Sequence, residues 1–475
     1  MVYFVVFCRK TRTLKGLNIM KLVLLSGGSG KRLWPLSNDS RSKQFLKVLK
    51  DSNGKLESMV QRVHRQIQTN YADKDIFIAT SKNQVEMLQN QLGKDVTVLI
   101  EPERRDTFPA IALAATYLFS EVGVSLDEVV CVLPVDPYVE DGFFRKIEFL
   151  EHAILQSDAE LALIGVKPTY PSEKYGYIVP RSSSVIQENY SAVSHFVEKP
   201  EVEHAKELIS KNAYWNCGVF AFKLDKIINR LEKKGLPVTY HQLLEQYHSL
   251  IKTSFDYEVV EQTKNIIFIP YDGEWKDLGT WNTLTEEMES HVLGKGSICD
   301  KSHNTHLINE LDIPVKVLGV TDAIIAVSPD GILISDKEES PKIKDAIKDI
   351  DQRIMYEERK WGYYRVLDFT KYETEEVLTR RIVINKGSHL SYQYHLKRKE
   401  VWTVLKGTAK VILDGKTLTL GAGSILEIQS GQKHGLLAID DFEMIEVQIG
   451  SELMEEDIYR ICLEWEEIET IKLSN

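Results

Sequence analysis

Residues 22–36 read LVLLSGGSGKRLWPL, an apolar run followed by three glycines within four residues and then two cations. A glycine-rich turn after a strand is typical of phosphate-binding sites. Two common motifs of this kind do not match. A P-loop requires glycine in place of Leu25 and serine or threonine in place of Arg32, and a dinucleotide-binding loop requires a small residue in place of Leu33. The stretch therefore predicts a phosphate site of another type.

Short apolar runs alternate with helix-like segments after this stretch. This alternation predicts an α/β fold with a mostly parallel sheet and helices on both faces. In such sheets, ligands bind beyond the carboxyl ends of the strands, so the glycine turn and Asp136 are expected to share one crevice. The strand-like runs cover residues 21–27, 75–81, 96–102, 128–136 and 161–168.

Length, charge and cysteine content limit the possible classes of protein. A chain of 475 residues exceeds one hydrophobic core, so two or three domains are expected. The net charge of −11 argues against a broad nucleic-acid surface. The five cysteines have no CxxC spacing, which favours free thiols in a reducing compartment and a cytoplasmic protein. We expect neither a nucleic-acid partner nor a membrane partner.

Changes in sequence texture predict the domain boundaries. Residues 1–19 have an apolar run before their cations, the reverse of a secretory signal, and we expect a disordered N-terminal extension. Residues 20–290 form the α/β unit. Residues 291–355 are rich in short strand-like pieces and end in a charged linker helix, and residues 356–475 are almost entirely strand-like up to a helical C-terminus.

The glycine turn carries the first group of candidate functional residues. Glycines let several backbone N–H groups converge on an anion, here from Gly27, Gly28 and Gly30. Arg32 adds a planar guanidinium suited to phosphate, and Lys43 follows as a second cation. The alternative is a tight turn between a strand and a helix with charges on its surface.

Six further motifs follow this stretch in a fixed order. Together they resemble sugar-phosphate nucleotidylyltransferases, specifically mannose-1-phosphate guanylyltransferases, over about residues 21–350. The resemblance implies a doubly wound mixed sheet of the nucleotide-diphospho-sugar transferase type, so that residues 20–290 are a nucleotidyltransferase domain. The motifs are EPERRDTFPAIALAA, LPVD, YGYI, FVEKP, WNCGVF and WKDLGTW.

The resemblance also implies a reaction. The phosphate of a sugar 1-phosphate attacks the α-phosphorus of a nucleoside triphosphate and expels pyrophosphate, with Mg²⁺ as the cofactor. Taken singly, Asp136 suits a turn and Asp277 a helix cap, but the ordered set favours the functional interpretation. The implied roles are nucleotide binding by Gly27, Gly28, Gly30 and Arg32, catalysis by Arg32 and Lys43, Mg²⁺ binding by Asp136 and Asp277, and sugar-phosphate binding by Gly176, Glu198, Lys199 and Asn216.

The chain departs from this family at residues 104–110, which read RRDTFPA where GRNTAPA is usual, and at Pro137, where histidine is usual. These departures remove no charge from the expected reaction path. They leave the choice of base open, and to a smaller degree the choice of sugar. GTP and mannose 1-phosphate are the expected substrates, and the alternative is a nucleotidyltransferase for another base or another hexose 1-phosphate.

The C-terminal unit carries an independent pattern. Glycines and polar residues fall at the spacing of the two cupin motifs, and the segment resembles the mannose-6-phosphate isomerase domain fused to some guanylyltransferases. This predicts an all-β barrel, with an Asp414-Gly415 hairpin within it. Two imidazoles, a carboxylate and an amide suit Zn²⁺ or another divalent metal. The candidate ligands are Gln393, His395, Glu400 and His434.

The barrel allows more than one function. An isomerase would take mannose 6-phosphate and would need a metal to polarise the carbonyl and a base to move the proton. The arginine that usually follows the last ligand is absent, because residues 434–438 read HGLLA. The alternatives are a non-catalytic binding or oligomerisation module, which leaves a homo-oligomer open, and a sugar-nucleotide-binding regulator without catalysis.

Overall fold

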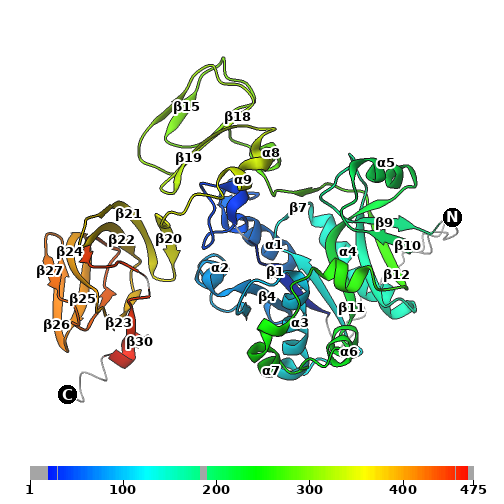
Figure 1. Cartoon of the computed structure of the whole chain (residues 1–475), viewed down its shortest axis with the longest axis horizontal. Coiled ribbons are helices and arrows are strands. Elements are labelled where there is room, and N and C mark those ends of the chain that lie inside the picture. Colours follow the sequence, from blue (N-terminus) through cyan, green and yellow to red (C-terminus); the bar gives the residue numbers. More distant parts are fainter. Residues whose placement is uncertain (1–19, 29, 182–189, 455, 469–475) are drawn as a thin grey trace, which may run out of the picture.

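The computed structural model describes residues 20–28, 30–181, 190–454 and 456–468. The expected N-terminal extension, residues 1–19, lies outside them. Figure 1 shows three parts in chain order: a large α/β part coloured blue to green, a β-rich connector in yellow-green, and a β-barrel in olive to red.

The α/β part is built on one mixed sheet. β1, which ends where the glycine turn begins, lies between β4 and β6 and is parallel to both. β11 is antiparallel to β6 and β8, and β10 is antiparallel to its neighbours. In spatial order the strands are β5 (Thr97–Glu101), β4 (Ile76–Ser81), β1 (Lys21–Ser26), β6 (Val129–Pro134), β11 (Tyr214–Lys223), β8 (Leu161–Val166), β12 (Ile266–Tyr271), β10 (Ser191–Val197) and β9 (Tyr177–Pro180).

Helices cover both faces of this sheet, as the alternation of the sequence predicts (Figure 1). One core holds Val63, Met87 and Ile147 from three helices on one face, and a second core holds Ile111, Ile228 and Leu243 from three helices on the other. These helices are α1 (Met59–Gln68), α2 (Val85–Leu92) and α4 (Asp141–Gln156) on the first face, and α3 (Thr107–Tyr117), α6 (Asp225–Lys233) and α7 (Tyr240–Glu245) on the second.

Several short elements complete this part. A two-stranded ribbon pairs β7 (Pro137–Val139) with β13 (Trp275–Asp277), and β2 (Leu49–Lys50) pairs with β3 (Leu56–Glu57). Helix α5 (Val202–Ser210) packs against β9 through Ala205 and Leu208.

The connector is a stack of short strands. Its main sheet pairs β14 and β16 in parallel, and β16 and β18 in parallel, before the antiparallel hairpin to β19. The elements are α8 (Trp281–Glu286), β14 (Val292–Gly294), β15 (Gly296–Ile298), β16 (His306–Asn309), β17 (Val315–Val317), β18 (Ala323–Ser328), β19 (Gly331–Asp336) and α9 (Ile343–Ala346).

The linker helix expected at the end of the connector is much shorter than its charged sequence suggests. Only the four residues of α9 are α-helical, preceded by a 3₁₀ turn at Ser340–Lys342. The chain beyond them is held in a non-helical conformation, because Gln352 donates to the carbonyl of Asp330 and the backbone N–H of Met355 donates to Asp330 Oδ1 at 2.6 Å. These tertiary contacts override helix propensity.

The connector also holds the segment that follows the glycine turn. Asn38 Nδ2 donates to Asp330 Oδ2 at 2.8 Å, and the Arg41 guanidinium makes two hydrogen bonds to Glu310. Gly331 is needed here because a Cβ atom would collide with the Trp34 ring. The two ends of residues 30–41 are therefore fixed by β1 and by the connector.

The C-terminal part is a barrel of two facing sheets around the core that contains Trp402, Val411 and Phe442. One sheet has the order β20 (Tyr356–Arg359), β21 (Gly362–Lys371), β22 (Glu376–Ile384), β29 (Phe442–Gly450), β24 (Arg398–Lys406) and β27 (Ile425–Ile428). The other has the order β26 (Lys416–Gly421), β25 (Thr408–Leu413), β28 (His434–Ala438), β23 (His389–Tyr394) and β30 (Tyr459–Cys462).

One element of the barrel corrects the sequence prediction. Residues 459–462 were expected in the C-terminal helix, but they form β30, which pairs with the edge of β23. Pairing with an available strand edge outweighs helix propensity for such a short segment. Among the described residues, none of the helices has the length and apolar character needed to cross a bilayer.

Candidate functional site

The glycine turn lies at the carboxyl end of β1. Gly27 and Gly28 are exposed, and Gly28 has a φ of 123°, a conformation that favours glycine. Its carbonyl oxygen accepts a hydrogen bond from Ser42 Oγ at 3.1 Å. Gly30 differs because it is buried and packs so closely on the backbone of Asn38 that a Cβ atom would not fit. The backbone of Gly27 and Gly28 is thus accessible to a ligand, and Gly30 allows the turn to pack against Asn38.

Two aspartates meet one lysine beside this turn. Lys43 Nζ lies 2.7 Å from Asp136 Oδ2 and 3.1 Å from Asp277 Oδ1. Asp136 follows β6, and the β7–β13 ribbon places Asp277 directly opposite Pro137. The ribbon therefore brings together two carboxylates that are far apart in sequence, next to the carboxyl end of the central strands.

Electrostatics fix the charges in this triad. Burial would lower the pKa of Lys43, but Asp136 and Asp277 outweigh it and raise that pKa above its ordinary value. Burial would raise the pKa of Asp277, but Lys43 and then Arg32 hold it below its ordinary value. The lysine is therefore a permanent cation and Asp277 a permanent anion at neutral pH. The carboxylate pair already accommodates one cation, which fits a site for Mg²⁺.

Arg32 lies in the 3₁₀ turn Gly30–Leu33 that follows the first glycines. Its side chain is exposed, and it forms no hydrogen bond or ion pair with any residue that the structure describes. It lies near enough to Asp277 to lower the pKa of that carboxyl. An uncommitted guanidinium at this position is available to a phosphate group.

The residues expected to bind the sugar phosphate lie in or next to β9, β10 and β11. Gly176 precedes β9, and its carbonyl accepts from the backbone N–H of Asn216 at 2.8 Å. Glu198 follows β10, and its side chain is only 4% exposed. One of its oxygens accepts from Lys199 Nζ at 2.5 Å, and the other, Oε2, is buried without a partner. A buried carboxylate oxygen without a donor is costly, so it fits a site that a ligand hydroxyl completes.

A cavity lies between Asn216 and the two aspartates. It has a volume of about 170 Å³, and both Asn216 and the aspartates reach it. Tyr175 and Trp275 form part of its wall, with ring centroids 5.4 Å apart. The complete lining is Pro134, Asp136, Pro137, Tyr175, Asn216, Cys217, Trp275 and Asp277.

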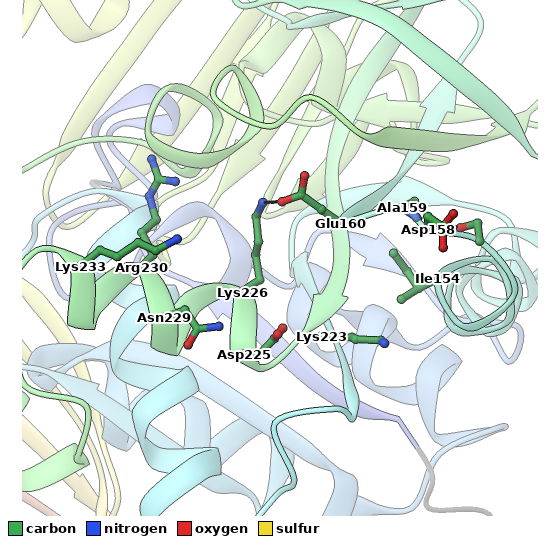
Figure 2. A pocket seen from close by; sticks show the side chains of 11 residues that line it. Ile154, Asp158, Ala159, Glu160, Lys223, Asp225, Lys226, Asn229, Arg230 and Lys233 are labelled. Carbon is green, nitrogen blue, oxygen red and sulfur yellow. Dashed lines mark hydrogen bonds and ion pairs between the residues drawn. The ribbon is translucent and has the colours of Figure 1, made fainter.

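A larger hollow, of about 460 Å³, lies elsewhere in the same domain (Figure 2). It is formed where β11 ends at Lys223 and α6 begins, and Lys226 pairs there with Glu160. It therefore lies at the end of β11 opposite Asn216. Because ligands of such sheets bind at the carboxyl ends of the parallel strands, the smaller cavity is the candidate active site.

The barrel holds a second candidate site. One ligand atom from each of His395, Glu400 and His434 lies within 4.8 Å of the others, and all three side chains are buried. His395 Nε2 is 3.2 Å from one Glu400 oxygen, and His434 Nε2 is 3.8 Å from the other. Three strands or strand ends supply them, namely the end of β23, β24 and β28.

The hydrogen bonds around this cluster prepare the two imidazoles as ligands. His395 Nδ1 donates to the carbonyl of Asp457 at 2.6 Å, and His434 Nδ1 donates to that of Gln432 at 3.0 Å. Each Nε2 therefore faces the cluster with its lone pair. That of His395 accepts from Arg398 Nη2 at 3.3 Å, whereas that of His434 is buried without a hydrogen-bond partner. Burial lowers the pKa of His395 to about 4, so its ring is neutral at neutral pH. This donor set fits a divalent metal.

Arg398 and Gln393 lie next to the cluster. Arg398 Nε donates to Glu400 Oε1 at 3.0 Å, so a guanidinium lies directly beside the carboxylate. Gln393 lies opposite His434 in the pairing of β23 and β28, and its amide oxygen accepts from Ser391 Oγ at 2.8 Å. Gln393 as a fourth ligand stays a prediction.

Comparison with known proteins agrees with both halves of this architecture. Residues 21–292 match the family described as nucleotidyl transferase. The chain belongs to this family. Residues 348–462 match the mannose-6-phosphate isomerase C-terminal family. The nucleotidyl transferase fold and the cupin-type barrel expected from the sequence are both confirmed.

Relatives of this nucleotidyl transferase match over both domains. The alginate biosynthesis protein AlgA of Pseudomonas aeruginosa is 29% identical over 92% of this chain and 95% of its own length. The mannose-1-phosphate guanylyltransferase RfbM of Salmonella typhimurium is 30% identical over 92% and 96%. The crystal structure described as mannose-1-phosphate geranyltransferase from Thermus thermophilus has a TM-score of 0.58 at 27% identity, covering 69% of this chain and 98% of its own.

Several residues of the nucleotidyl transferase site are not among those expected from the sequence. Tyr175 and Trp275 stand inside the YGYI and WKDLGTW motifs, so their position next to Gly176 and Asp277 could have been anticipated. Asp256 could not, because it lies in SFDYEVV, outside these motifs. Its Oδ1 accepts from Asn216 Nδ2 at 2.7 Å.

Proposed function

We propose that this chain transfers GMP from GTP to mannose 1-phosphate, forming GDP-mannose and releasing pyrophosphate. The observation that carries the proposal is the contact of Lys43 with both Asp136 and Asp277 beside the exposed glycine turn. Two anionic substrates must approach each other in this reaction, so fixed positive charge at their meeting point lowers the barrier most.

The residues around the triad have distinct roles in this proposal. An oxygen of the sugar phosphate attacks the α-phosphorus, and the bond from that phosphorus to the oxygen bridging the β-phosphorus breaks. Gly27 and Gly28 bind the triphosphate through their backbone, while Arg32 and Lys43 stabilise the charge that moves onto pyrophosphate. Mg²⁺, held by Asp136 and Asp277, supplies further charge neutralisation when bound.

The sugar phosphate binds beside Asn216, which lines the cavity, in this proposal. Lys199 binds its phosphate, and Glu198 and Asn216 bind its hydroxyls. The unpartnered Glu198 Oε2 supports this role, because a sugar hydroxyl would satisfy it. A Cβ on Gly176 would collide with Phe196 Cζ and lie 2.5 Å from the same oxygen, so only glycine fits beside both side chains.

We assign the choice of base to residues 104–110, where the sequence departs from the family. Arg104 Nη1 donates to Asp39 Oδ1 at 3.0 Å, and Asp106 caps α3 with a φ of 70°. This segment therefore contacts the loop that follows the glycine turn. A panel of four nucleoside triphosphates against mannose, glucose and galactose 1-phosphates tests the proposed substrate pair. Pyrophosphate release only with GTP and mannose 1-phosphate supports it, whereas preference for another pair selects the alternative nucleotidyltransferase.

We further propose that the barrel binds a divalent metal, such as Zn²⁺, and interconverts mannose 6-phosphate and fructose 6-phosphate. The buried, unpartnered Nε2 of His434 facing Glu400 favours this function over a purely structural barrel. Purified protein supplied with Zn²⁺, Co²⁺ or Mn²⁺ should convert mannose 6-phosphate in a coupled assay. A protein that retains metal but shows no turnover would be a binding or oligomerisation module there.

The product and location follow from the same proposal. Relatives are named for alginate and xanthan biosynthesis, and we assign the GDP-mannose of this chain to polysaccharide synthesis as well. We place the enzyme in the cytoplasm. The four cysteines of the described residues are all unpaired, which suits that reducing compartment.

A further inference from the structure

Asp256 lies within the proposed sugar-phosphate site, although nothing in the motifs assigns it a role. It begins a π-helical turn, Asp256–Val260, whose preceding residue Phe255 is fully buried. The backbone N–H of Phe255 donates to Thr107 Oγ1 at 2.8 Å, which ties the turn to the start of α3. The position of the Asp256 carboxyl is therefore set by the core.

Asn216 connects this carboxyl to the expected sugar-binding residues. The Asn216 amide oxygen accepts from the backbone N–H of Gly218 at 3.1 Å, and its amide nitrogen donates to Asp256 Oδ1 at 2.7 Å. Each end of the amide thus makes one hydrogen bond within the protein. Asn216 therefore holds Asp256 in place, and its second amide N–H is left for a sugar hydroxyl.

The carboxylate oxygens of this site outnumber the hydrogen-bond donors that the described residues direct at them. Glu198 and Asp256 lie close enough for the charge of one to act on the other, and Lys199 is the cation that both face. Lys199 Nζ is engaged by Glu198 Oε1, and Glu198 Oε2 stays buried without a donor. Lys199 also has a φ of 44°, a strained conformation typical of functional sites. The missing partners are hydrogen-bond donors, which a sugar supplies through its hydroxyls.

The protonation of Asp256 suits a hydroxyl partner. Burial and then the charge of Glu198 raise its pKa to about 7, although Lys199 and Asn216 act in the opposite direction. A carboxyl group that titrates near neutral pH can accept a hydrogen bond from a hydroxyl or donate one to it. The raised pKa of Asp256 agrees with the hydrogen-bond geometry around its carboxyl group.

We propose that Asp256 is a specificity-determining residue that hydrogen-bonds a hydroxyl of the hexose 1-phosphate beside Glu198, with Asn216 holding it in place. The inference rests on the proposed function, because it assigns a new contact within the same site. It differs from a purely structural role, in which Asp256 would only anchor the start of the turn.

The test combines Asp256→Asn with monodeoxy substrates. The variant keeps the shape of the side chain and its acceptor for Asn216. Its KM for mannose 1-phosphate should rise by about 10- to 100-fold, the range for one hydrogen bond to a charged group, with the KM for GTP unchanged. On the one analogue of 2-, 3-, 4- or 6-deoxymannose 1-phosphate that lacks the contacted hydroxyl, the variant and the wild type should have the same KM.

Glu258→Gln is the matched control. It neutralises a carboxyl in the same turn, but Glu258 faces α6, where it pairs with Arg230 at 2.8 Å. It should leave the KM for mannose 1-phosphate unchanged. An Asp256→Asn penalty that is equal on the parent substrate and on all four analogues, or no penalty at all, would overturn the assignment of Asp256.

The wild type separates this inference from the proposed function. A wild type that releases no pyrophosphate with mannose 1-phosphate contradicts the proposed function and the sugar contact with it. A wild type that is active, together with an Asp256→Asn variant of equal KM, contradicts the contact alone.

Discussion

Lys43 and Asp277 are 234 residues apart in the chain, yet Lys43 Nζ lies 3.1 Å from Asp277 Oδ1. The same nitrogen contacts Asp136, so one ammonium group joins the two carboxylates proposed to bind Mg²⁺. The contact depends on the β7–β13 ribbon, which sets Asp277 against the residue that follows Asp136. The reaction centre is thus assembled from the first, middle and last segments of the α/β domain.

The first prediction concerns the charge of Lys43. Lys43→Met should lower kcat for nucleotidyl transfer by about 10²- to 10³-fold, the usual effect of removing one preorganised electrostatic group. Steady-state kinetics with saturating GTP and mannose 1-phosphate measure it. Lys47→Met is the control, because Lys47 is exposed four residues away and its ammonium group pairs with no carboxylate among the described residues. Equal kcat values for the two variants would contradict the role of Lys43.

The second prediction concerns the space beside Glu198. Gly176→Ala should raise the KM for mannose 1-phosphate at least tenfold and leave that for GTP unchanged, because the new Cβ would collide with Phe196 Cζ and press on Glu198 Oε2 at 2.5 Å. Gly142→Ala serves as the comparison. Its Cβ would meet only the end of the Arg145 side chain at 3.3 Å, in the first turn of α4. If Gly176→Ala binds mannose 1-phosphate as the wild type does, the sugar is not next to Glu198.

The third prediction concerns the metal of the barrel. His434→Gln should abolish stoichiometric metal binding, measured by elemental analysis after dialysis against Zn²⁺, because it removes the unpartnered Nε2. Nucleotidyl transfer should continue at the wild-type rate, since the cluster lies in the barrel. His389→Gln, on β23 but outside the cluster, should retain its metal. Full metal content in the His434 variant would show that the cluster is not the site.

The fourth prediction uses the pKa of Asp256. Its value of about 7 in the folded protein lies above that of an unfolded aspartate, so the folded state binds the extra proton between about pH 4 and 7. The stabilising contribution of this group is complete at low pH and is lost as the pH rises towards 7. The melting temperature of Asp256→Asn minus that of the wild type should therefore increase between pH 5 and pH 8. A difference that does not change with pH would contradict the raised pKa.

The sequence allowed the fold class and much of the candidate site to be predicted. Apolar runs that end in glycine or aspartate mark the carboxyl ends of strands, and β1 and β6 indeed end beside the glycine turn and Asp136. The Asp414-Gly415 hairpin was also predictable, and both residues have the positive φ that such a turn requires. These features are encoded by residues that are neighbours in the chain.

Features that depend on distant residues were not predictable. The β7–β13 ribbon has only three residues per strand, too few to give a pattern, yet it positions Asp277. The helix expected near residue 343 is cut short by contacts of Gln352 and Met355 with Asp330. Asp256 is a functional candidate only because Asn216, forty residues earlier, donates to it.

The most direct test of the central claim is a product balance with the wild-type chain, GTP, mannose 1-phosphate and Mg²⁺. Pyrophosphate and GDP-mannose are measured in the same reaction, with and without a chelator of Mg²⁺. The account predicts one GDP-mannose for each pyrophosphate, and no product when the metal is chelated. Absence of pyrophosphate release from this pair, or release without GDP-mannose, would contradict it.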